Sequence, residues 1–326
     1  MKKLTLSLFL FVLLLASCKQ KLNKEPIRLE GNVFGTTYHI TYLDAVKNHQ
    51  KSIDSLFYLV NKSLSTYMPT SDISKINKGD TTIVVDELFL EVFKKSKRIY
   101  KETDGYFDIT VGNLVNAWGF GPKKQKIDLD SSQVKKQMKF VGLDKVSIEN
   151  GKVIKQFPEI YLDVNSIAKG YGLDVIGRFF ESKNITNYLI EIGGEIRAKG
   201  KNSKQKPWRV GIDNPNTDGT RTIRDHVELS NQAMASSGNY RKFRTTADGK
   251  KYVHTVNPKT GFATESNLLS ATVYANLDCA DVDAYATAFM AMGLEKAKLF
   301  LAEHSEVKAI LVYINAKGEI ESFKSE

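Results

Sequence analysis

From Val33 the chain changes to an alternation of polar and apolar side chains that continues to Tyr42 and indicates a strand. A period of two is typical of a strand with one buried face. Patterns of the same kind predict strands over residues 188–199 with a break at Gly193-Gly194, over 208–212, over 270–274, and in a final hairpin where Lys317-Gly318 turns residues 310–314 back towards Ile320.

Three other segments repeat their apolar residues at helical spacing. The first follows Asp86, whose side chain suits an N-cap, and ends before Gly105. The second begins just after Asp163 and places an apolar residue at every fourth position from 167 to 179. The third runs from about residue 279 to 303 with alanine and methionine on its buried side. No regular βαβ repeat is present, so we predict an α+β fold of mixed, largely antiparallel sheets flanked by helices, in a single two-lobed catalytic unit.

The first residues have the features of an export signal. Lys2 and Lys3 precede an apolar run over residues 4–15, which is too short to cross a membrane as an ordinary helix. The run ends in Leu-Ala-Ser-Cys, which resembles the bacterial lipobox, in which the cysteine, here Cys18, is acylated; a plain cleaved signal is the alternative. We therefore expect a lipoprotein signal peptide over residues 1–17, a lipid-anchored tether over 18–30 and a folded domain over 31–326. The protein would then be attached to the lipid bilayer of the bacterial cell envelope, facing the periplasm or extracytoplasmic space.

Composition excludes some classes of protein. Apolar residues make up 42% and aromatic residues 10% of the chain, which is enough for a substantial core. Once Cys18 carries lipid, only Cys279 remains, so no internal disulfide can form. The net charge of +10 is spread along the chain without a recognition motif, and we therefore expect no nucleic acid as a partner.

The third predicted helix carries a possible metal site. Asp283 and Thr287 are four residues apart, so they project from the same face of a helix, whereas Asp281 points elsewhere. A carboxylate and a hydroxyl are hard oxygen ligands suited to Mg²⁺. Taken alone, this pair is more often a solvated face or a cap. The neighbouring Ala284 and Ala288 would let another backbone approach closely.

Other candidate residues lie in turns. Glycine clusters interrupt ordered segments where glycine costs stability unless the backbone needs it, and close approach of a ligand is one such need. His254 ends a strand-like run before Pro258 and is suited either to proton transfer and phosphate binding or to a structural hydrogen bond. No Walker loop, Rossmann fingerprint, nucleophile elbow or His-Glu-x-x-His pair is present, which argues against the common nucleotide folds and hydrolases.

Taken in order, the motifs of the chain resemble those of the ApbE family of flavin transferases. The matching segments are Gly-Thr-Thr-Tyr at 35–38, Ser-Thr-Tyr at 65–67 with Ser-Asp-Ile-Ser-Lys-Ile-Asn at 71–77, Gly-Tyr-Phe-Asp-Ile-Thr-Val-Gly at 105–112, Trp-Gly-Phe-Gly at 118–121, Leu-Asp at 162–163, Ile-Ala-Lys-Gly-Tyr at 167–171, Gly-Gly-Glu at 193–195, Ala-Ser-Ser-Gly-Asn-Tyr at 235–240, the His254 turn and Asp-Val-Asp-Ala-Tyr-Ala-Thr at 281–287. They span almost the entire mature chain.

The resemblance implies an enzyme that uses Mg²⁺ to split the pyrophosphate of its substrate FAD. It would release AMP and leave FMN on a Thr or Ser of an exported or membrane-bound flavoprotein subunit, such as those of redox complexes. By position, the metal would be held by Asp283, Thr287 and the backbone carbonyl of Ser166. Flavin contacts would fall on Phe34, Tyr67, Tyr106, Phe107, Asp108, Asp163, Lys169 and Val256. The general base stays open between His254 and a metal-bound group.

Some positions depart from the pattern of the family. Phe34 stands where Met is common, Asn165-Ser166 replaces a frequent Gly-Ala, and Asn239 stands where Asp is frequent. A ligand supplied by a main-chain carbonyl tolerates such a replacement at Ser166. Two other functions remain open: a Mg²⁺-dependent FAD pyrophosphatase that yields FMN and AMP, and a lipoprotein that binds flavin without catalysis.

Overall fold

The computed structural model describes residues 25–122, 129–214, 220, 222–239, 243–245, 251–263 and 266–325. Its helices are α2 (Gln50–Leu64), α3 (Asp72–Asn77), α4 (Glu87–Glu102), α5 (Gly112–Ala117), α6 (Ser131–Met138), the 3₁₀ turn η1 (Leu143–Lys145), α7 (Ala168–Ser182), α8 (Cys279–Met292) and α9 (Leu294–Glu303). Its strands are β1 (Ile27–Val33), β2 (Thr36–Tyr42), β3 (Val146–Glu149), β4 (Lys152–Lys155), β5 (Tyr188–Ile192), β6 (Glu195–Lys199), β7 (Trp208–Asp213), β8 (Ile223–Leu229), β9 (Gln232–Gly238), β10 (Phe243–Thr245), β11 (Lys251–Val253), β12 (Leu268–Ala275), β13 (Lys308–Ile314) and β14 (Ile320–Lys324).

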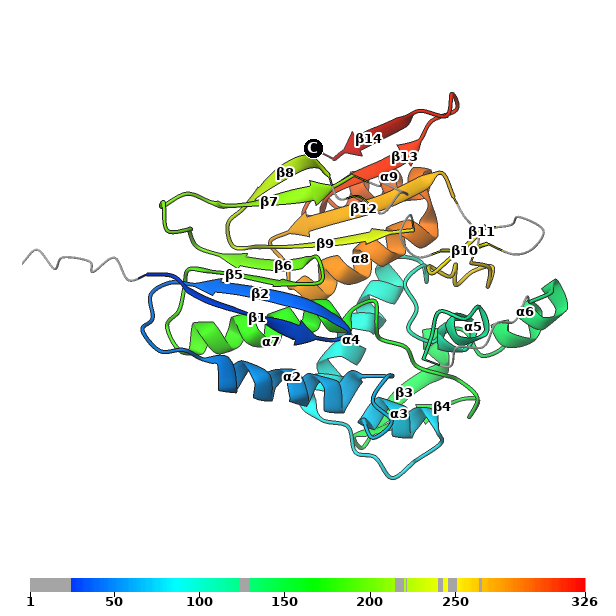
Figure 1. Ribbon diagram of the computed structural model, residues 1–326. Helices are drawn as coiled ribbons and strands as arrows, with labels where there is room; N and C mark the ends of the chain where they lie inside the picture. Colours follow the sequence, from blue (N-terminus) through cyan, green and yellow to red (C-terminus); the bar gives the residue numbers. More distant parts are fainter. Residues whose placement is uncertain are drawn as a thin grey trace, which may run out of the picture.

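One eight-stranded sheet organises the fold (Figure 1). Its strand order is β1-β2-β5-β6-β9-β12-β13-β14, and each neighbouring pair is antiparallel. The other strands form separate two-stranded sheets: β3 with β4, β7 with β8, and β10 with β11. The prediction of an α+β fold with largely antiparallel sheets is confirmed.

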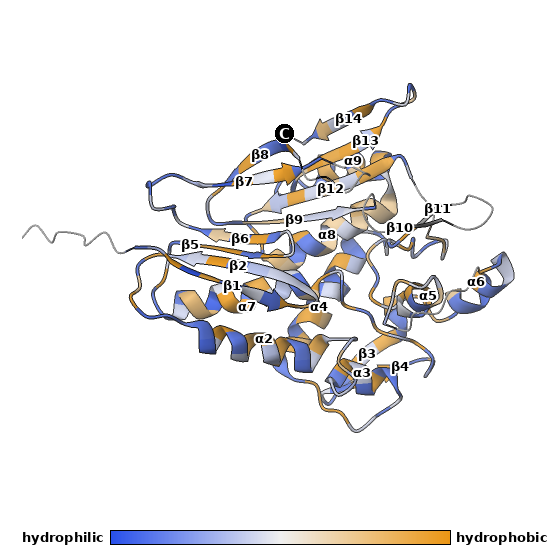
Figure 2. Ribbon diagram, viewed as in Figure 1, coloured by the Kyte–Doolittle hydropathy of each residue, from blue (hydrophilic) through white to orange (hydrophobic). Residues whose placement is uncertain are grey.

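The two faces of the large sheet belong to different cores. In β9, Met234 packs with Trp208 and Leu229 of the β7-β8 hairpin, whereas Ala233 and Ala235 on either side of Met234 belong to the main core with α7 and α8. This alternation follows from the period of two in a strand. A third, smaller core lies around α5 and α6. Helix α2 is also divided into an apolar side and a hydrophilic side, and Figure 2 shows the hydrophilic side turned away from the sheet.

Several predicted elements agree with the structure. Asp86 is the N-cap of α4, and its side chain accepts a hydrogen bond from Phe89 N. The turn between β5 and β6 falls at Gly193 and Gly194, which both have positive φ. The hairpin at Gly318 pairs Ile314 with Ile320, as expected.

Two predicted helices have different limits in the structure. The predicted third helix is divided at Gly293, whose φ of 79° ends α8 and begins α9, because glycine enters this conformation at little cost. Helix α7 begins at Ala168 rather than just after Asp163. The intervening residues form turns, in which Asn165 N donates to Asp163 Oδ1 and Ile167 N donates to Val164 O.

The folded part of the chain also begins earlier than predicted. Residues 27–30 were expected in the tether, but they belong to β1, which pairs with β2 along its whole length. A tether, if present, would therefore end before Ile27. The predicted signal peptide and Cys18 lie outside the described residues. Among the residues that the structure describes, none of the helices combines the length and the apolar character needed to span a membrane.

Candidate functional site

Helices α7 and α8 cross with their backbones in close contact. A Cβ atom at Gly170 would lie 2.4 Å from the carbonyl oxygen of Cys279, so only glycine allows this approach. The Gly170 N–H donates to Asp283 Oδ2 at 3.0 Å, and Asp283 is 4% exposed. A carboxylate of α8 thus satisfies an N–H in the first turn of α7, where the helix dipole favours negative charge.

The three predicted metal ligands lie around this crossing. Ser166 is four residues before Gly170, and in a regular helix its carbonyl would accept the Gly170 N–H. That N–H goes to Asp283 instead, and no other described residue donates to the Ser166 carbonyl. Thr287 lies one turn after Asp283, with its Oγ1 3.3 Å from Ser237 Oγ. These residues therefore offer a carbonyl, a carboxylate and a hydroxyl, a donor set that fits Mg²⁺.

The proposed metal shell contains a single carboxylate. Within the described parts of the chain, no three His, Cys, Asp or Glu residues are grouped so that they could hold a metal ion. Asp281, two residues before Asp283, points away, as expected from the helical spacing. Its Oδ1 accepts from Lys95 Nζ at 3.1 Å and lies 2.8 Å from Arg98 Nη2. Substrate phosphates or water would have to supply the remaining ligands of a metal.

Lys169 supplies positive charge in the same turn of α7. Its Nζ donates to Glu195 Oε1 at 2.7 Å, and Glu195 is 3% exposed. Burial alone would lower the pKa of Lys169, but the negative charges of Glu195 and Asp283 outweigh it and raise that pKa. Lys169 therefore remains charged at neutral pH. Glu195 Oε2 accepts no hydrogen bond from the described residues. Glu195 was not among the predicted site residues, although it belongs to the Gly-Gly-Glu motif.

Hydrogen bonds assemble a second part of the site from three segments. The Asn77 side chain pairs with both the N–H and the carbonyl of Leu162, each at 2.8 Å. The next N–H, of Asp163, donates to Ile109 O at 2.7 Å. Asn165 Nδ2 reaches Thr66 Oγ1 at 3.2 Å. The segments around residues 66, 109 and 163 are thus held side by side.

Three of the predicted aromatic flavin contacts lie in different surroundings. Tyr67 is 60% exposed, and partial burial together with the charge of Asp163 raises its pKa. Tyr106 accepts a hydrogen bond from Lys296 Nζ, which lies 4.8 Å from the centre of its ring. Phe34, with a φ of 50° in the β1-β2 turn, lies against Gly172, where a Cβ would be 2.6 Å from its ring. Tyr67 therefore has the most open ring face of the three for a flat ligand.

Asp108 is a buried structural carboxylate rather than an open ligand. It is 6% exposed, and its Oδ1 accepts from both the N–H and the hydroxyl of Thr110 at 2.7 Å. Thr110 Oγ1 in turn accepts from Gly142 N at 2.7 Å. Burial raises the pKa of Asp108 to about 6, although the hydrogen bonds from Thr110 oppose the rise. Asp108 thus fixes the segment that carries Tyr106.

The raised pKa of Asp108 gives a test by pH. A carboxyl whose pKa rises from 3.8 to about 6 on folding binds its proton more tightly in the folded state. The wild-type protein should therefore lose stability relative to Asp108→Asn, by up to about 3 kcal/mol, as the pH rises from about 4 to about 7. Urea unfolding of both proteins across this range measures the difference. A difference that does not change with pH would contradict the burial argument.

Comparisons with known proteins decide the family. The ApbE family model matches residues 34–311. The chain belongs to the ApbE family. A relative from Haemophilus influenzae, named FAD:protein FMN transferase, is 37% identical, and the match covers 93% of this chain and 90% of the relative. The protein of that name from Escherichia coli K12 is 33% identical over 91% of this chain and 86% of its own length. Among solved structures, the flavin transferase ApbE from Vibrio cholerae superposes with a TM-score of 0.83 at 33% identity, covering 93% of this chain and 97% of the other.

Two apolar residues among the flavin contacts implied by the ApbE resemblance have buried side chains. Phe107 is 1% exposed in the main core, and Val256 is 5% exposed in the small core with Trp118. The tightly packed main core therefore surrounds the ring of Phe107. At both positions only the backbone remains suited to contact a ligand.

The loop that contains His254 is attached to the far end of α8. Asn257 Nδ2 donates to the carbonyl of Ala291 at 3.1 Å, one turn beyond Thr287. Thr255 Oγ1 donates to Asn239 Oδ1 at 3.0 Å, which connects the loop to the end of β9. His254 thus belongs to a loop fixed next to the helix of Asp283 and Thr287.

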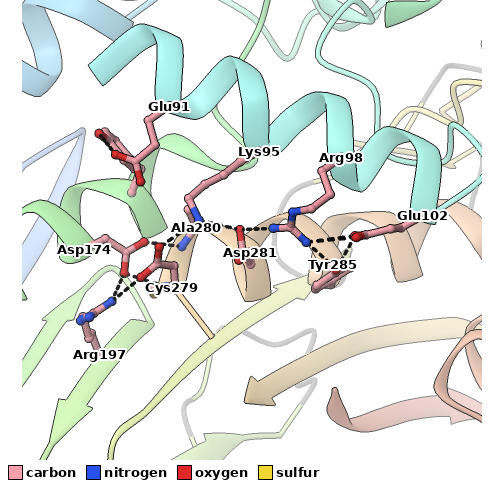
Figure 3. Close-up of polar contacts among 12 residues, drawn as sticks. Glu91, Lys95, Arg98, Glu102, Asp174, Arg197, Cys279, Ala280, Asp281 and Tyr285 are labelled. Atoms are coloured by element: carbon pink, nitrogen blue, oxygen red, sulfur yellow. Dashed lines mark hydrogen bonds and ion pairs between the residues drawn. The ribbon is translucent and has the colours of Figure 1, made fainter. Parts of the chain in front are cut away.

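An ionic network beside the site was not predicted from the sequence. Figure 3 shows Glu91, Lys95, Arg98 and Glu102 along one face of α4. Lys95 and Arg98 pair with Asp281 of α8. Glu102 accepts a hydrogen bond from Tyr285 of α8, and Glu91 pairs with Arg178 of α7. Arg197 of β6 joins the network through Asp174 (Figure 3) and also pairs with Asp278. The spacing on α4 is readable as one helical face, but nothing in the sequence identifies its partners.

Proposed function

We propose that this chain transfers the FMN half of FAD to a Thr or Ser hydroxyl of an exported acceptor protein, in a Mg²⁺-dependent reaction that releases AMP. The observation that carries the proposal is the crossing of α7 and α8, where Asp283 accepts from Gly170 N–H beside Lys169. Oxygen ligands and a fixed cation at one helix start suit a pyrophosphate. The names of the relatives support FAD as substrate and a protein as acceptor.

The residues have separate roles in this proposal. Asp283, Thr287 and the Ser166 carbonyl would hold Mg²⁺, which neutralises charge on the pyrophosphate oxygens when bound. Lys169 adds positive charge at the phosphates, and Glu195 holds the Lys169 ammonium in place. Tyr67 offers a ring face to the flavin.

The reaction is a displacement at one phosphorus atom. The acceptor hydroxyl oxygen bonds to the phosphorus of the FMN half, the bond from that phosphorus to the bridging oxygen breaks, and AMP leaves with this oxygen. The hydroxyl proton must pass to a base, and His254 is our candidate because its loop is attached to α8. Holding the two reacting groups in line is the main contribution of the protein.

The products distinguish this proposal from its two alternatives. The full-length protein is incubated with FAD and Mg²⁺, with and without a threonine-bearing acceptor peptide, and nucleotides are separated by chromatography. A transferase releases AMP in proportion to modified acceptor. A pyrophosphatase releases equal amounts of AMP and free FMN whether or not the acceptor is present. A flavin-binding lipoprotein returns FAD intact.

We further propose that Cys18 carries lipid and anchors the domain in the cell envelope beside membrane-bound acceptor subunits. The support is the lipobox pattern, and two or three acyl chains on one residue suffice for stable anchoring. Cys18→Ser should move the protein from the membrane fraction to the soluble fraction of the expressing bacteria. Retention of this variant in the membrane would contradict the anchor.

Tyr67→Ala should weaken FAD binding without slowing turnover at saturation. Tyr67 is 60% exposed, so its removal costs the fold little, but a flavin would lose a stacking surface of roughly 1–2 kcal/mol. KM for FAD should therefore rise about 5- to 30-fold with kcat nearly unchanged. Tyr58→Ala is the matched control, because Tyr58 is 57% exposed and lies on α2 outside the site. Equal KM values for the two variants would remove Tyr67 from the site.

A further inference from the structure

Helices α7 and α8 cap each other. The Gly170 N–H in the first turn of α7 donates to Asp283 of α8 at 3.0 Å. In return, the Cys279 and Ala280 N–H groups in the first turn of α8 donate to the two carboxylate oxygens of Asp174 of α7, at 2.8 and 2.9 Å (Figure 3). Asp283 lies four residues after Cys279, and Asp174 lies four residues after Gly170. The arrangement is therefore reciprocal, with one capping carboxylate on each helix.

Neither helix uses its own N-cap side chain for this purpose. The N-cap of α7 is Ile167, which has no polar side chain. The N-cap of α8 is Asp278, whose carboxylate makes no capping bond and instead lies 2.9 Å from Lys95 Nζ and 2.7 Å from Arg178 Nη2. The Gly170 N–H of α7 and the first two N–H groups of α8 thus depend on the partner helix.

The side chain of Asp174 is held in this position by several contacts. Its side chain is fully buried, and Arg197 Nη1 donates to the oxygen that also accepts from Cys279 N–H. The charge of Asp174 is matched by a cation that is itself largely buried. A carboxylate with a buried partner and two backbone donors has little freedom to move.

We propose that Asp174 is a positioning residue for the metal and phosphate site, a role that rests on the proposed function. The backbones of Gly170 and Cys279 are in contact where the helices cross. One turn further along each helix lies the carboxylate that caps the partner helix, Asp174 on α7 and Asp283 on α8. Two such attachments prevent α8 from sliding or rotating against α7. Because α8 carries Asp283 and Thr287, and the turn before α7 carries the Ser166 carbonyl, Asp174 fixes the distance between ligands that it does not touch.

The test replaces Asp174 by asparagine in the full-length protein. Asparagine keeps the size of the side chain and one carbonyl oxygen, but its NH₂ group cannot accept the second N–H of α8. Affinity for Mn²⁺ alone, measured by EPR, should fall about tenfold or more, as expected when a group that orients a ligand is lost. Amide hydrogen exchange of Gly170 should become faster, although its acceptor Asp283 is unchanged.

Arg98→Gln is the matched control. Arg98 binds Asp281 on α8 at 2.8 Å, so this variant also loses an attachment of α8, but it leaves both caps intact. It should lose stability while keeping the wild-type Mn²⁺ affinity and Gly170 exchange rate. If Asp174→Asn speeds exchange only at Cys279 and Ala280 and keeps wild-type Mn²⁺ affinity, Asp174 is a local cap and the proposal is overturned.

A measurement on the wild-type protein keeps the proposal testable if Asp174→Asn does not fold. The amides of Gly170, Cys279 and Ala280 should exchange through one shared opening, with the same free energy and the same dependence on denaturant. Separate openings at the two helix starts would overturn the proposal. None of these readouts needs FAD or an acceptor, so a wild-type protein that transfers no FMN would refute the proposed function without deciding the role of Asp174.

Discussion

Asp283→Ala is expected to abolish the metal-dependent release of AMP from FAD. Asp283 is the only charged group among the proposed metal ligands, and stabilisation of transition-state charge by a metal contributes several kcal/mol. Turnover should therefore fall by about 10³-fold or more. Stability should change little, because the loss of the cap on Gly170 is offset by the removal of a buried carboxylate whose pKa is raised by that burial. A coupled AMP assay with titrated Mg²⁺ measures the effect.

Two variants separate the charge of Asp283 from its structural role. Asp283→Asn retains an oxygen that can accept the Gly170 N–H, so it should be as inactive as Asp283→Ala with α7 still capped. Asp281→Asn lies on the same helix but loses ion pairs with Lys95 and Arg98 of α4. That variant should be less stable and should still turn over. Near wild-type turnover by Asp283→Asn would refute the metal assignment.

Gly170→Ala should cost both stability and activity. The new methyl group would lie 2.4 Å from the Cys279 carbonyl oxygen, and a backbone atom of a packed helix cannot move aside as a side chain can. Overpacking costs about 3 kcal/mol or more here, against a gain of about 1 kcal/mol in helix propensity. Since the strain is relieved by separating α7 from α8, turnover should fall about 100-fold. Thermal unfolding and the AMP assay measure the two effects.

Gly172→Ala is the control on the same helix. Its methyl group would meet the edge of the Phe34 ring at 2.6 Å, and that ring can rotate away. Both variants gain the same helix propensity. The difference in their stability therefore measures the cost of disturbing the backbone contact between α7 and α8. Equal stability of the two variants would show that the crossing of α7 and α8 tolerates a side chain, contrary to our account.

The sequence predicts which helices and strands form better than it predicts where they begin and end. Asp86 was identifiable as an N-cap because an acidic residue directly precedes a run of helical periodicity. The break at Gly293 was not identifiable, because the apolar pattern continues across it and a single glycine is tolerated inside many helices. Strand β1 was missed because its polar residues, such as Arg28 and Glu30, resemble those of a tether, and only its pairing with β2 makes it a strand.

The candidate site was predictable where it depends on local spacing or on resemblance. Asp283 and Thr287 share a helical face, and Asp281 was correctly excluded from that face. The roles of Glu195 and Asp174 could not be predicted, because each depends on a partner distant in the sequence, Lys169 in one case and Cys279 in the other. The burial of Phe107 could not be predicted for the same reason, because its neighbours in the core come from other elements of the chain.

The mass of an acceptor protein after incubation tests the central claim most directly. An exported flavoprotein subunit is incubated with FAD, Mg²⁺ and either the wild-type protein or Asp283→Asn, and its intact mass and modified residue are determined by mass spectrometry. Our account predicts a gain of one FMN less one water on a single Thr or Ser, with one AMP released for each modified acceptor and no gain with Asp283→Asn. An unmodified acceptor in the presence of free FMN and AMP, or of intact FAD, would contradict it.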